Sequence, residues 1–172
     1  MSRLIRSLTL RSLTLVAISL CGTVASAKPS LKEGDAAPPF IAKGDDGKAY
    51  TLEQFKGRPV VLYFYPKDGT PGCTVEARHF RDDAKAYEAK GAVVLGVSFD
   101  DAKSHKAFRE KHGLTFPLLV GNDALADAYG VPVRFGYASR QSFVIGRDGR
   151  LRKVFRDVDV ENHSRDVLKL LD

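Results

Sequence analysis

The order of apolar and turn-forming segments predicts an α/β protein with a mixed central β-sheet flanked by helices on both faces. Val60–Tyr65 is an unbroken apolar and aromatic run, which is typical of a strand buried on both faces. Val93–Ser98 is a second such run after a helical segment, so we expect the two strands to lie parallel. Gln141–Ile145 and Leu151–Phe155 flank the turn sequence Arg147–Gly149, which predicts an antiparallel hairpin at the end of the sheet.

The other segments complete the order hairpin, β-α-β-α-β-α, hairpin and helix. After an extended arm over Leu31–Pro39, the sequence predicts an N-terminal β-hairpin of Phe40–Ala42 and Ala49–Thr51, and then a helical turn over Thr51–Phe55. Further along we expect helices over Cys73–Ala89, Asp100–His112, Asp123–Tyr129 and Glu161–Leu171, with a short strand over Phe116–Val120. No repeat or linker divides residues 28–172, which predicts a single domain.

The first 27 residues have the pattern of a secretory signal peptide. Three arginines precede the apolar run Leu13–Val24, which is followed by Ala25-Ser26-Ala27. That run is shorter than the about 20 residues that a membrane-spanning helix needs. We therefore expect cleavage after Ala27 and an exported, periplasmic protein. A buried N-terminal helix is one alternative, and a lipid anchor on Cys21 is another, although Leu20 precedes it where a small residue is favoured.

The charge of the chain does not favour nucleic acid as a partner. Removing the leader lowers the formal net charge from +6 to +3, a value that bears on solubility. No Lys/Arg-rich block is interleaved with aromatic residues, and no segment beyond the leader is apolar enough to span a membrane. We expect no nucleic-acid binding, and no membrane association once the leader is removed.

Cys73 would be the only cysteine left after cleavage, which in an exported protein suggests a reactive thiol or an intermolecular bridge. An inert buried cysteine is the alternative. Cys73 follows the strand Val60–Tyr65 and the loop Pro66–Gly72, at the start of a helix. Sites in open α/β sheets lie at the carboxyl ends of strands, and a helix N-terminus favours a thiolate. The two prolines and two glycines around this loop favour a reactive role.

A helix terminus alone does not make a highly reactive thiol. Lowering a cysteine pKa from about 8.5 to about 6 takes about 3.4 kcal/mol, whereas a helix N-terminus supplies about 0.3–1 kcal/mol. The lower pKa also makes the sulfur less nucleophilic. A reactive site therefore needs a cation and hydrogen-bond donors that bind the charge developing on a substrate, for which Thr70 and a distant arginine are the candidates.

At this point the sequence resembles a known family. Pro66-x3-Thr70-x2-Cys73 matches the Pro-x3-Thr/Ser-x2-Cys signature of peroxiredoxins, and the wider segment 63–77 resembles their bacterioferritin-comigratory-protein (Q) branch. Further matching pieces follow in family order: Val97–Asp100, Ser104-His105, Phe116–Leu119 and Arg140–Ile145. The resemblance covers nearly all of residues 32–171 and implies a thioredoxin-like fold.

The resemblance also implies roles for residues of the site. Cys73 would be the peroxidatic cysteine, shielded by Pro66 and hydrogen-bonded through Thr70, with Gly72 in a supporting position. Arg140 would supply the cation, although taken alone it is simply a solvated arginine before a strand. Glu76 could cap the helix or orient Arg140, and both roles stay open.

Many members of this branch carry a resolving cysteine five residues after the peroxidatic one, where this chain has Arg78. The sequence is therefore identified as a one-cysteine variant. It would act as a monomer that reduces hydrogen peroxide and organic hydroperoxides in antioxidant defence. Its sulfenic acid would be reduced by an external thiol: a thioredoxin-like or glutaredoxin-like protein, or glutathione. We expect no cofactor and no metal, since His79, His105 and His112 do not converge with other ligands.

Other classes fit less well. A disulfide reductase needs Cys-x-x-Cys, and the glutathione peroxidases of this fold use a tryptophan that the chain lacks. A peroxide sensor or thiol-relay protein remains the alternative function, because its first chemical step is the same.

Overall fold

The computed structural model describes residues 30–171, so the predicted signal peptide lies outside the described residues. The strands are β1 (Ile41–Gly44), β2 (Ala49–Thr51), β3 (Val60–Phe64), β4 (Val93–Ser98), β5 (Leu118–Val120), β6 (Val133–Arg134), β7 (Tyr137–Ala138), β8 (Gln141–Ile145) and β9 (Leu151–Phe155). The helices are a 3-10 turn η1 (Leu52–Phe55), α1 (Pro71–Asp82), α2 (Ala84–Ala89), α3 (Ala102–His112), α4 (Asp123–Ala128) and α5 (His163–Leu168).

The predicted mixed sheet is confirmed: seven strands lie in the order β2-β1-β5-β4-β3-β8-β9. Strand β3 runs parallel to β4 and antiparallel to β8, and all five of its residues are buried. This is why its sequence is continuously apolar rather than alternating. The predicted terminal hairpin is present as β8 and β9, which pair antiparallel.

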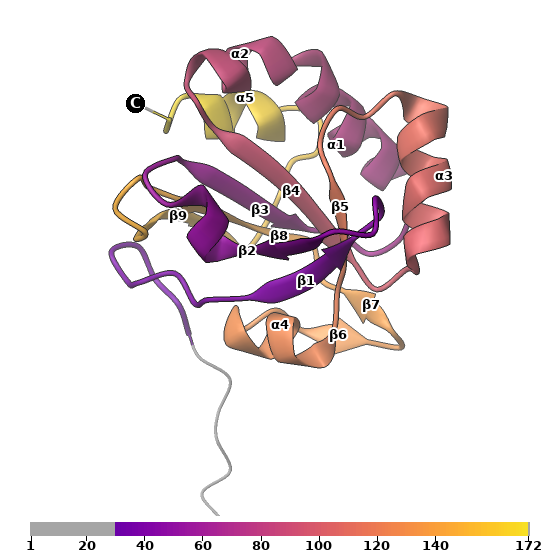
Figure 1. Ribbon diagram of the computed structural model, residues 1–172, viewed down its shortest axis with the longest axis horizontal. Coiled ribbons are helices and arrows are strands. Elements are labelled where there is room, and N and C mark those ends of the chain that lie inside the picture. The colour runs from indigo at the N-terminus through magenta and orange to yellow at the C-terminus, as the bar shows by residue number, and fades with distance from the viewer. Residues whose placement is uncertain (1–29, 172) are drawn as a thin grey trace, which may run out of the picture.

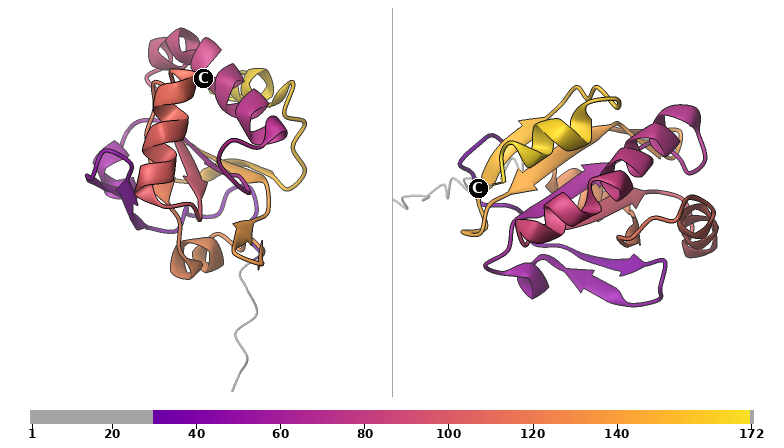
Figure 2. Two further views of the ribbon diagram at one scale, coloured as in Figure 1. Left: turned by 90° about the vertical axis from the view of Figure 1, so that its right-hand side faces the viewer. Right: turned by 90° about the horizontal axis from the view of Figure 1, so that it is seen from above.

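The side chains of β3 and of Tyr65, which follows it, divide between two apolar layers, because successive residues of a strand point to opposite faces. Val61, Tyr63 and Tyr65 pack with residues of α1, α2, α3 and α5, whereas Val60, Leu62 and Phe64 pack with α4 and the N-terminal arm. Figure 1 shows α1, α2 and α5 above the sheet and α4 below it. The view from above in Figure 2 shows α1 and α5 side by side on one face. Helices therefore cover both faces, as predicted.

Three details differ from the sequence-based expectation. The single helix expected over Cys73–Ala89 begins earlier, at Pro71, and is interrupted at Asp83. The Asp83 carboxylate accepts a hydrogen bond from Ser164 Oγ of α5 at 2.7 Å, a tertiary contact that no local pattern reveals. The final helix is also shorter than expected, covering His163–Leu168 only.

The small β6–β7 hairpin is the third difference, because the sequence did not suggest it. Its turn places Phe135 and Gly136 at φ values of 53° and 79°. Two-residue turns of this kind usually contain Asn-Gly or Asp-Gly. Because Phe135 stands at the first of these positions, the sequence does not resemble a hairpin turn there.

The register between β3 and β8 brings Arg140 close to the loop that leads into α1. Gln141 of β8 lies opposite Phe64, the last residue of β3, so Arg140 enters beside the carboxyl end of β3. The loop that leads into α1 leaves from this same end of β3. No helix within residues 30–171 is both long and apolar enough to cross a membrane.

Candidate active site

Cys73 is the third residue of α1, and its side chain is buried, with 1% relative exposure. Thr70 is the N-cap residue, and Pro71 occupies the first helical position, where a missing N–H costs nothing. The Thr70 carbonyl accepts the hydrogen bond of the Thr74 N–H at 2.9 Å, which starts the helix. Within residues 30–171, Cys73 is the only cysteine and forms no disulfide.

Arg140 supplies the cation beside the thiol. Its Nη2 donates a hydrogen bond to Cys73 Sγ at 3.2 Å, although the two residues are 67 positions apart in the sequence. Its Nη1 donates to the carboxylate of Glu76, which is one turn further along α1 than Cys73. The guanidinium thus connects the sulfur to a buried carboxylate. This geometry stabilises negative charge on Sγ.

Glu76 orients Arg140 and does not cap α1. The N-terminus of α1 has no side-chain cap, and the Glu76 side chain is fully buried. Burial raises the pKa of Glu76 to about 7, while the positive charge of Arg140 acts in the opposite direction. Burial alone would lower the pKa of Arg140, but the charges of Glu76 and Cys73 outweigh it and raise that pKa. Of the two roles that the sequence left open, the structure contains the contact with Arg140.

His163 is part of this environment, and the sequence analysis missed it. Its Nε2 lies 2.8 Å from Ser142 Oγ of β8 and 3.9 Å from Glu76 Oε1. Burial lowers the pKa of His163 to about 4, and the charge of Arg140 acts in the same direction. The imidazole is therefore neutral at neutral pH, and Arg140 is the charged partner of Glu76. No sequence motif links α5 to this site.

The other predicted site residues lie in the loop before α1. The Thr70 hydroxyl donates to the Lys67 carbonyl at 3.1 Å, so in this structure it does not bond the thiol. Pro66 is partly buried directly after Tyr65. A Cβ added at Gly72 would lie 3.5 Å from Arg140 Nη2, an ordinary contact, so Gly72 leaves room next to the guanidinium without being sterically required.

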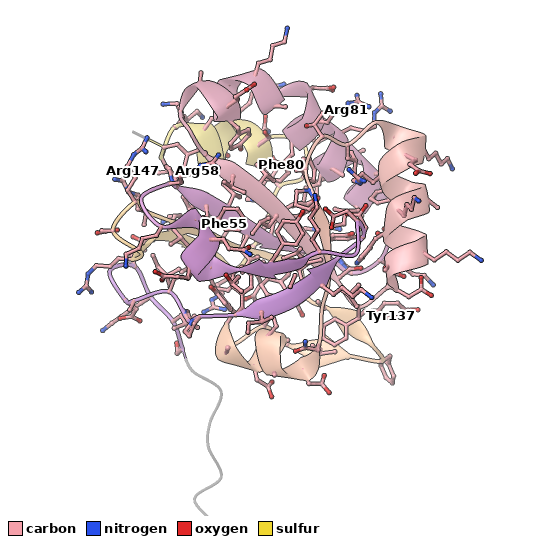
Figure 3. The ribbon with its side chains drawn as sticks, in the orientation of Figure 1. Phe55, Arg58, Phe80, Arg81, Tyr137 and Arg147 are labelled. Atoms are coloured by element: carbon pink, nitrogen blue, oxygen red, sulfur yellow. The ribbon has the colours of Figure 1, made fainter. Side chains whose placement is uncertain are left out.

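Two surface hollows lie apart from the thiol. One, of about 520 Å³, is lined by residues that include Phe55, Arg58 and Phe80, and the other, of about 400 Å³, includes Arg58 and Arg147. Figure 3 shows these side chains around the sheet. Neither hollow is lined by Cys73, Thr70 or Arg140.

Residues 30–171 contain no group of three or more His, Cys, Asp or Glu side chains placed to hold a metal ion. His105 does have a close polar partner, Asp68, which the sequence analysis did not foresee. Chemically, the site is a recessed thiol at a helix N-terminus with an arginine bound to it, an arrangement that is typical of proteins with a reactive cysteine.

Comparison with known proteins narrows that class. Residues 33–154 match the AhpC/TSA family. Peroxiredoxin Q from the chloroplast of Suaeda salsa is 44% identical over 152 residues, which cover 86% of this chain and 71% of that protein. Peroxiredoxin Bcp from Bacillus subtilis is 42% identical over 150 residues, which cover 83% of this chain and 96% of that protein.

Solved structures give the same assignment. A cysteine-to-serine mutant of PrxQ from Xylella fastidiosa superimposes with a TM-score of 0.76 at 33% identity, covering 82% of this chain and 95% of that one. The bacterioferritin comigratory protein of Xanthomonas campestris, studied for alkyl peroxide reduction, has a TM-score of 0.73 at 34% identity, covering 80% of this chain and 97% of that one. The chain therefore belongs to the AhpC/TSA family and is a peroxiredoxin, a thiol-dependent peroxidase with a thioredoxin-like fold.

Proposed function

We propose that Cys73 is the peroxidatic cysteine, that hydrogen peroxide and organic hydroperoxides are its substrates, and that an external thiol regenerates it. The contact of Arg140 Nη2 with Cys73 Sγ at 3.2 Å supports the proposal most directly, because Glu76 holds the guanidinium from its other side. The same cation that favours the thiolate is placed to bind a peroxide oxygen arriving at the sulfur.

In the proposed reaction the Cys73 thiolate attacks the terminal oxygen of the hydroperoxide. The S–O bond forms as the O–O bond breaks, and Cys73 becomes a sulfenic acid. The departing oxygen takes up a proton and leaves as water or an alcohol. Thr70 contributes after its hydroxyl rotates away from the Lys67 carbonyl toward the reacting oxygens, and Pro66 limits access of water.

The return to the reduced state needs a partner. The stretch 30–171 holds no second cysteine, and Arg78 occupies the position of a nearby resolving thiol. A thiol of a thioredoxin-like or glutaredoxin-like protein, or glutathione, attacks the sulfenic sulfur and releases water. A second thiol then resolves the mixed disulfide. This cycle makes the protein a one-cysteine peroxiredoxin that acts as a monomer.

Turnover measurements test the proposal. Peroxide consumption by the protein lacking residues 1–27 is followed with thioredoxin, with glutaredoxin plus glutathione, and with glutathione alone. We expect sustained turnover with at least one of these reductants and none with Cys73→Ser. A single stoichiometric oxidation with every reductant contradicts the enzyme and favours a peroxide sensor.

Residues 1–27 support a second part of the proposal, which is that the protein is exported and acts in the periplasm. This part rests on the order of positive charge, apolar run and Ala25-Ser26-Ala27 in the sequence. Expression with its own leader in a Gram-negative host tests it. N-terminal sequencing should find Lys28 in the periplasmic fraction, and an intact Met1 end or a lipid on Cys21 contradicts cleavage after Ala27.

A further inference from the structure

Asp68 connects the loop between β3 and α1 to α3 through hydrogen bonds of its side chain. Its carboxylate is 6% exposed and accepts three hydrogen bonds, from Tyr65 OH at 2.7 Å, Ser104 Oγ at 2.8 Å and His105 Nδ1 at 2.9 Å. Burial acts to raise the pKa of Asp68, but the bond from His105 and the other donors outweigh it and lower that pKa. The carboxylate is therefore ionised and can only accept hydrogen bonds.

The same loop is also held through its backbone. The Asp68 N–H donates to Asp100 Oδ2 at 2.8 Å, and that oxygen also accepts from Ser98 Oγ at 2.7 Å. Asp68 thus connects the loop to the end of β4 and to α3. Thr70 is two residues further along this loop, and Cys73 follows five residues after Asp68.

The surroundings of His105 determine its protonation state. The imidazole is fully buried, and its Nε2 lies 3.1 Å from the Leu119 carbonyl oxygen of β5. A carbonyl oxygen only accepts, so Nε2 carries a proton. Nδ1 faces the Asp68 carboxylate at 2.9 Å, which also only accepts, so Nδ1 carries a proton as well.

Among the described residues, no other group donates a hydrogen bond to either ring nitrogen of His105. The Tyr65 hydroxyl, 3.4 Å from Nδ1, has its proton directed at Asp68 Oδ1. The titratable groups facing this pair are Tyr65, directly after β3, and Asp100, which accepts a hydrogen bond from the Asp68 N–H. Both ring nitrogens of His105 therefore donate.

We propose that His105 is a buried imidazolium whose ion pair with Asp68 positions the loop that carries Thr70 and leads into Cys73. The pair connects that loop to α3 through His105 itself and to β5 through Leu119. His105 and Asp68 are positioning residues, and the inference rests on the proposed peroxidatic role of Cys73. A charge of either sign left alone in this interior is costly, so the loop has one favoured position.

Nuclear magnetic resonance of the ring nitrogens tests the charge directly. At neutral pH, 15N-labelled protein should show two protonated nitrogens for His105. Detection of one unprotonated ring nitrogen in the His105 signal overturns the proposal. This measurement needs no variant and does not depend on catalysis.

Single-turnover kinetics test the positioning role. We measure the rate of Cys73 oxidation by hydrogen peroxide and, separately, its alkylation by iodoacetamide, which needs an accessible thiolate but no aligned donors. In His105→Gln and Asp68→Asn, peroxide oxidation should fall by about 10²-fold because the donors are displaced, while alkylation changes by less than about threefold. His112→Gln, on the same helix, is the matched control and should leave both rates unchanged.

Equal losses in both rates, or no loss in either, contradict positioning by this pair. If the two variants do not fold, the wild-type protein still tests the charge on His105. The ring-nitrogen spectrum of the unmodified protein then stands as the test, and one unprotonated nitrogen in the His105 signal overturns the proposal. If wild-type Cys73 fails to react with peroxide at all, the proposed function itself is wrong.

Discussion

His163 gives a quantitative prediction about stability against pH. The ring is 2% exposed, packs edge-on against Phe80 and Phe155, and bonds Ser142 Oγ at 2.8 Å. Burial lowers its pKa from 6.5 to about 4, so the folded protein resists protonation that the unfolded chain accepts. The stability that the neutral ring contributes is fully present above pH 6.5 and is lost as the pH falls through about 4.

The size of the effect follows from the same two values. At about 1.4 kcal/mol per pH unit, lowering the pH from 7 to 4.5 should cost the wild-type protein about 2 kcal/mol through His163. Glu76 acts in the opposite sense. Its pKa is raised from 4.5 to about 7, so its contribution is present below pH 4.5 and is lost as the pH rises through about 7. Without His163, the effect of Glu76 is no longer offset. A variant that lacks His163 should therefore be more stable at low pH, relative to its own stability at pH 7, than the wild type is.

The assay is urea unfolding of the wild type and of His163→Gln at pH 7 and pH 4.5. Glutamine can still bond Ser142, and the lost ring packing lowers the free energy of unfolding equally at both pH values. The difference between the two proteins should shift by about 2 kcal/mol between the two pH values. His112→Gln serves as the control and should shift far less, because His112 is only partly buried. An identical pH dependence in the wild type and in His163→Gln would refute the argument that the buried ring stays neutral.

Three further predictions concern the thiol. Cys73→Ser should keep the fold, as measured by circular dichroism, and should lose peroxidase activity, since a hydroxyl is far less acidic than a thiol. Turnover above a few per cent of the wild-type rate contradicts this prediction. Arg140→Ala should slow peroxide oxidation of Cys73 by about 10²–10³-fold even at alkaline pH, where thiol ionisation no longer limits the rate. An unchanged alkaline rate in stopped-flow experiments removes Arg140 from the site. One equivalent of peroxide should give a sulfenic acid that dimedone traps, and excess peroxide should drive it to the inactive sulfinic acid. Intact mass should therefore rise by one and then two oxygens, whereas a rapid, quantitative disulfide dimer means that a second subunit resolves Cys73.

The sequence by itself determined the elements whose information is local. The unbroken apolar run of β3, the second buried run of β4 and the turn between β8 and β9 each predict their structure from neighbouring residues, and the sheet confirms them. The loop ahead of Cys73 was also readable, because its prolines, glycines and Thr70 lie close to the thiol in the sequence. Arg140 could be named only through the family resemblance, since nothing in its own neighbourhood indicates a site.

Only the tertiary structure decided which distant side chains meet. Glu76 orients Arg140, rather than capping α1, because the register of β8 on β3 delivers the guanidinium across 64 residues to a buried carboxylate. The interruption at Asp83 and the arrival of His163 depend on how α5 packs on α1, which neither helix encodes alone. Asp68 and His105 lie 37 residues apart and appear in the sequence as a loop acid and a helix histidine. Their pairing depends on the packing of α3 against the sheet. Local propensity acts over only a few residues, whereas buried polar groups form hydrogen bonds with the groups that the packing places next to them.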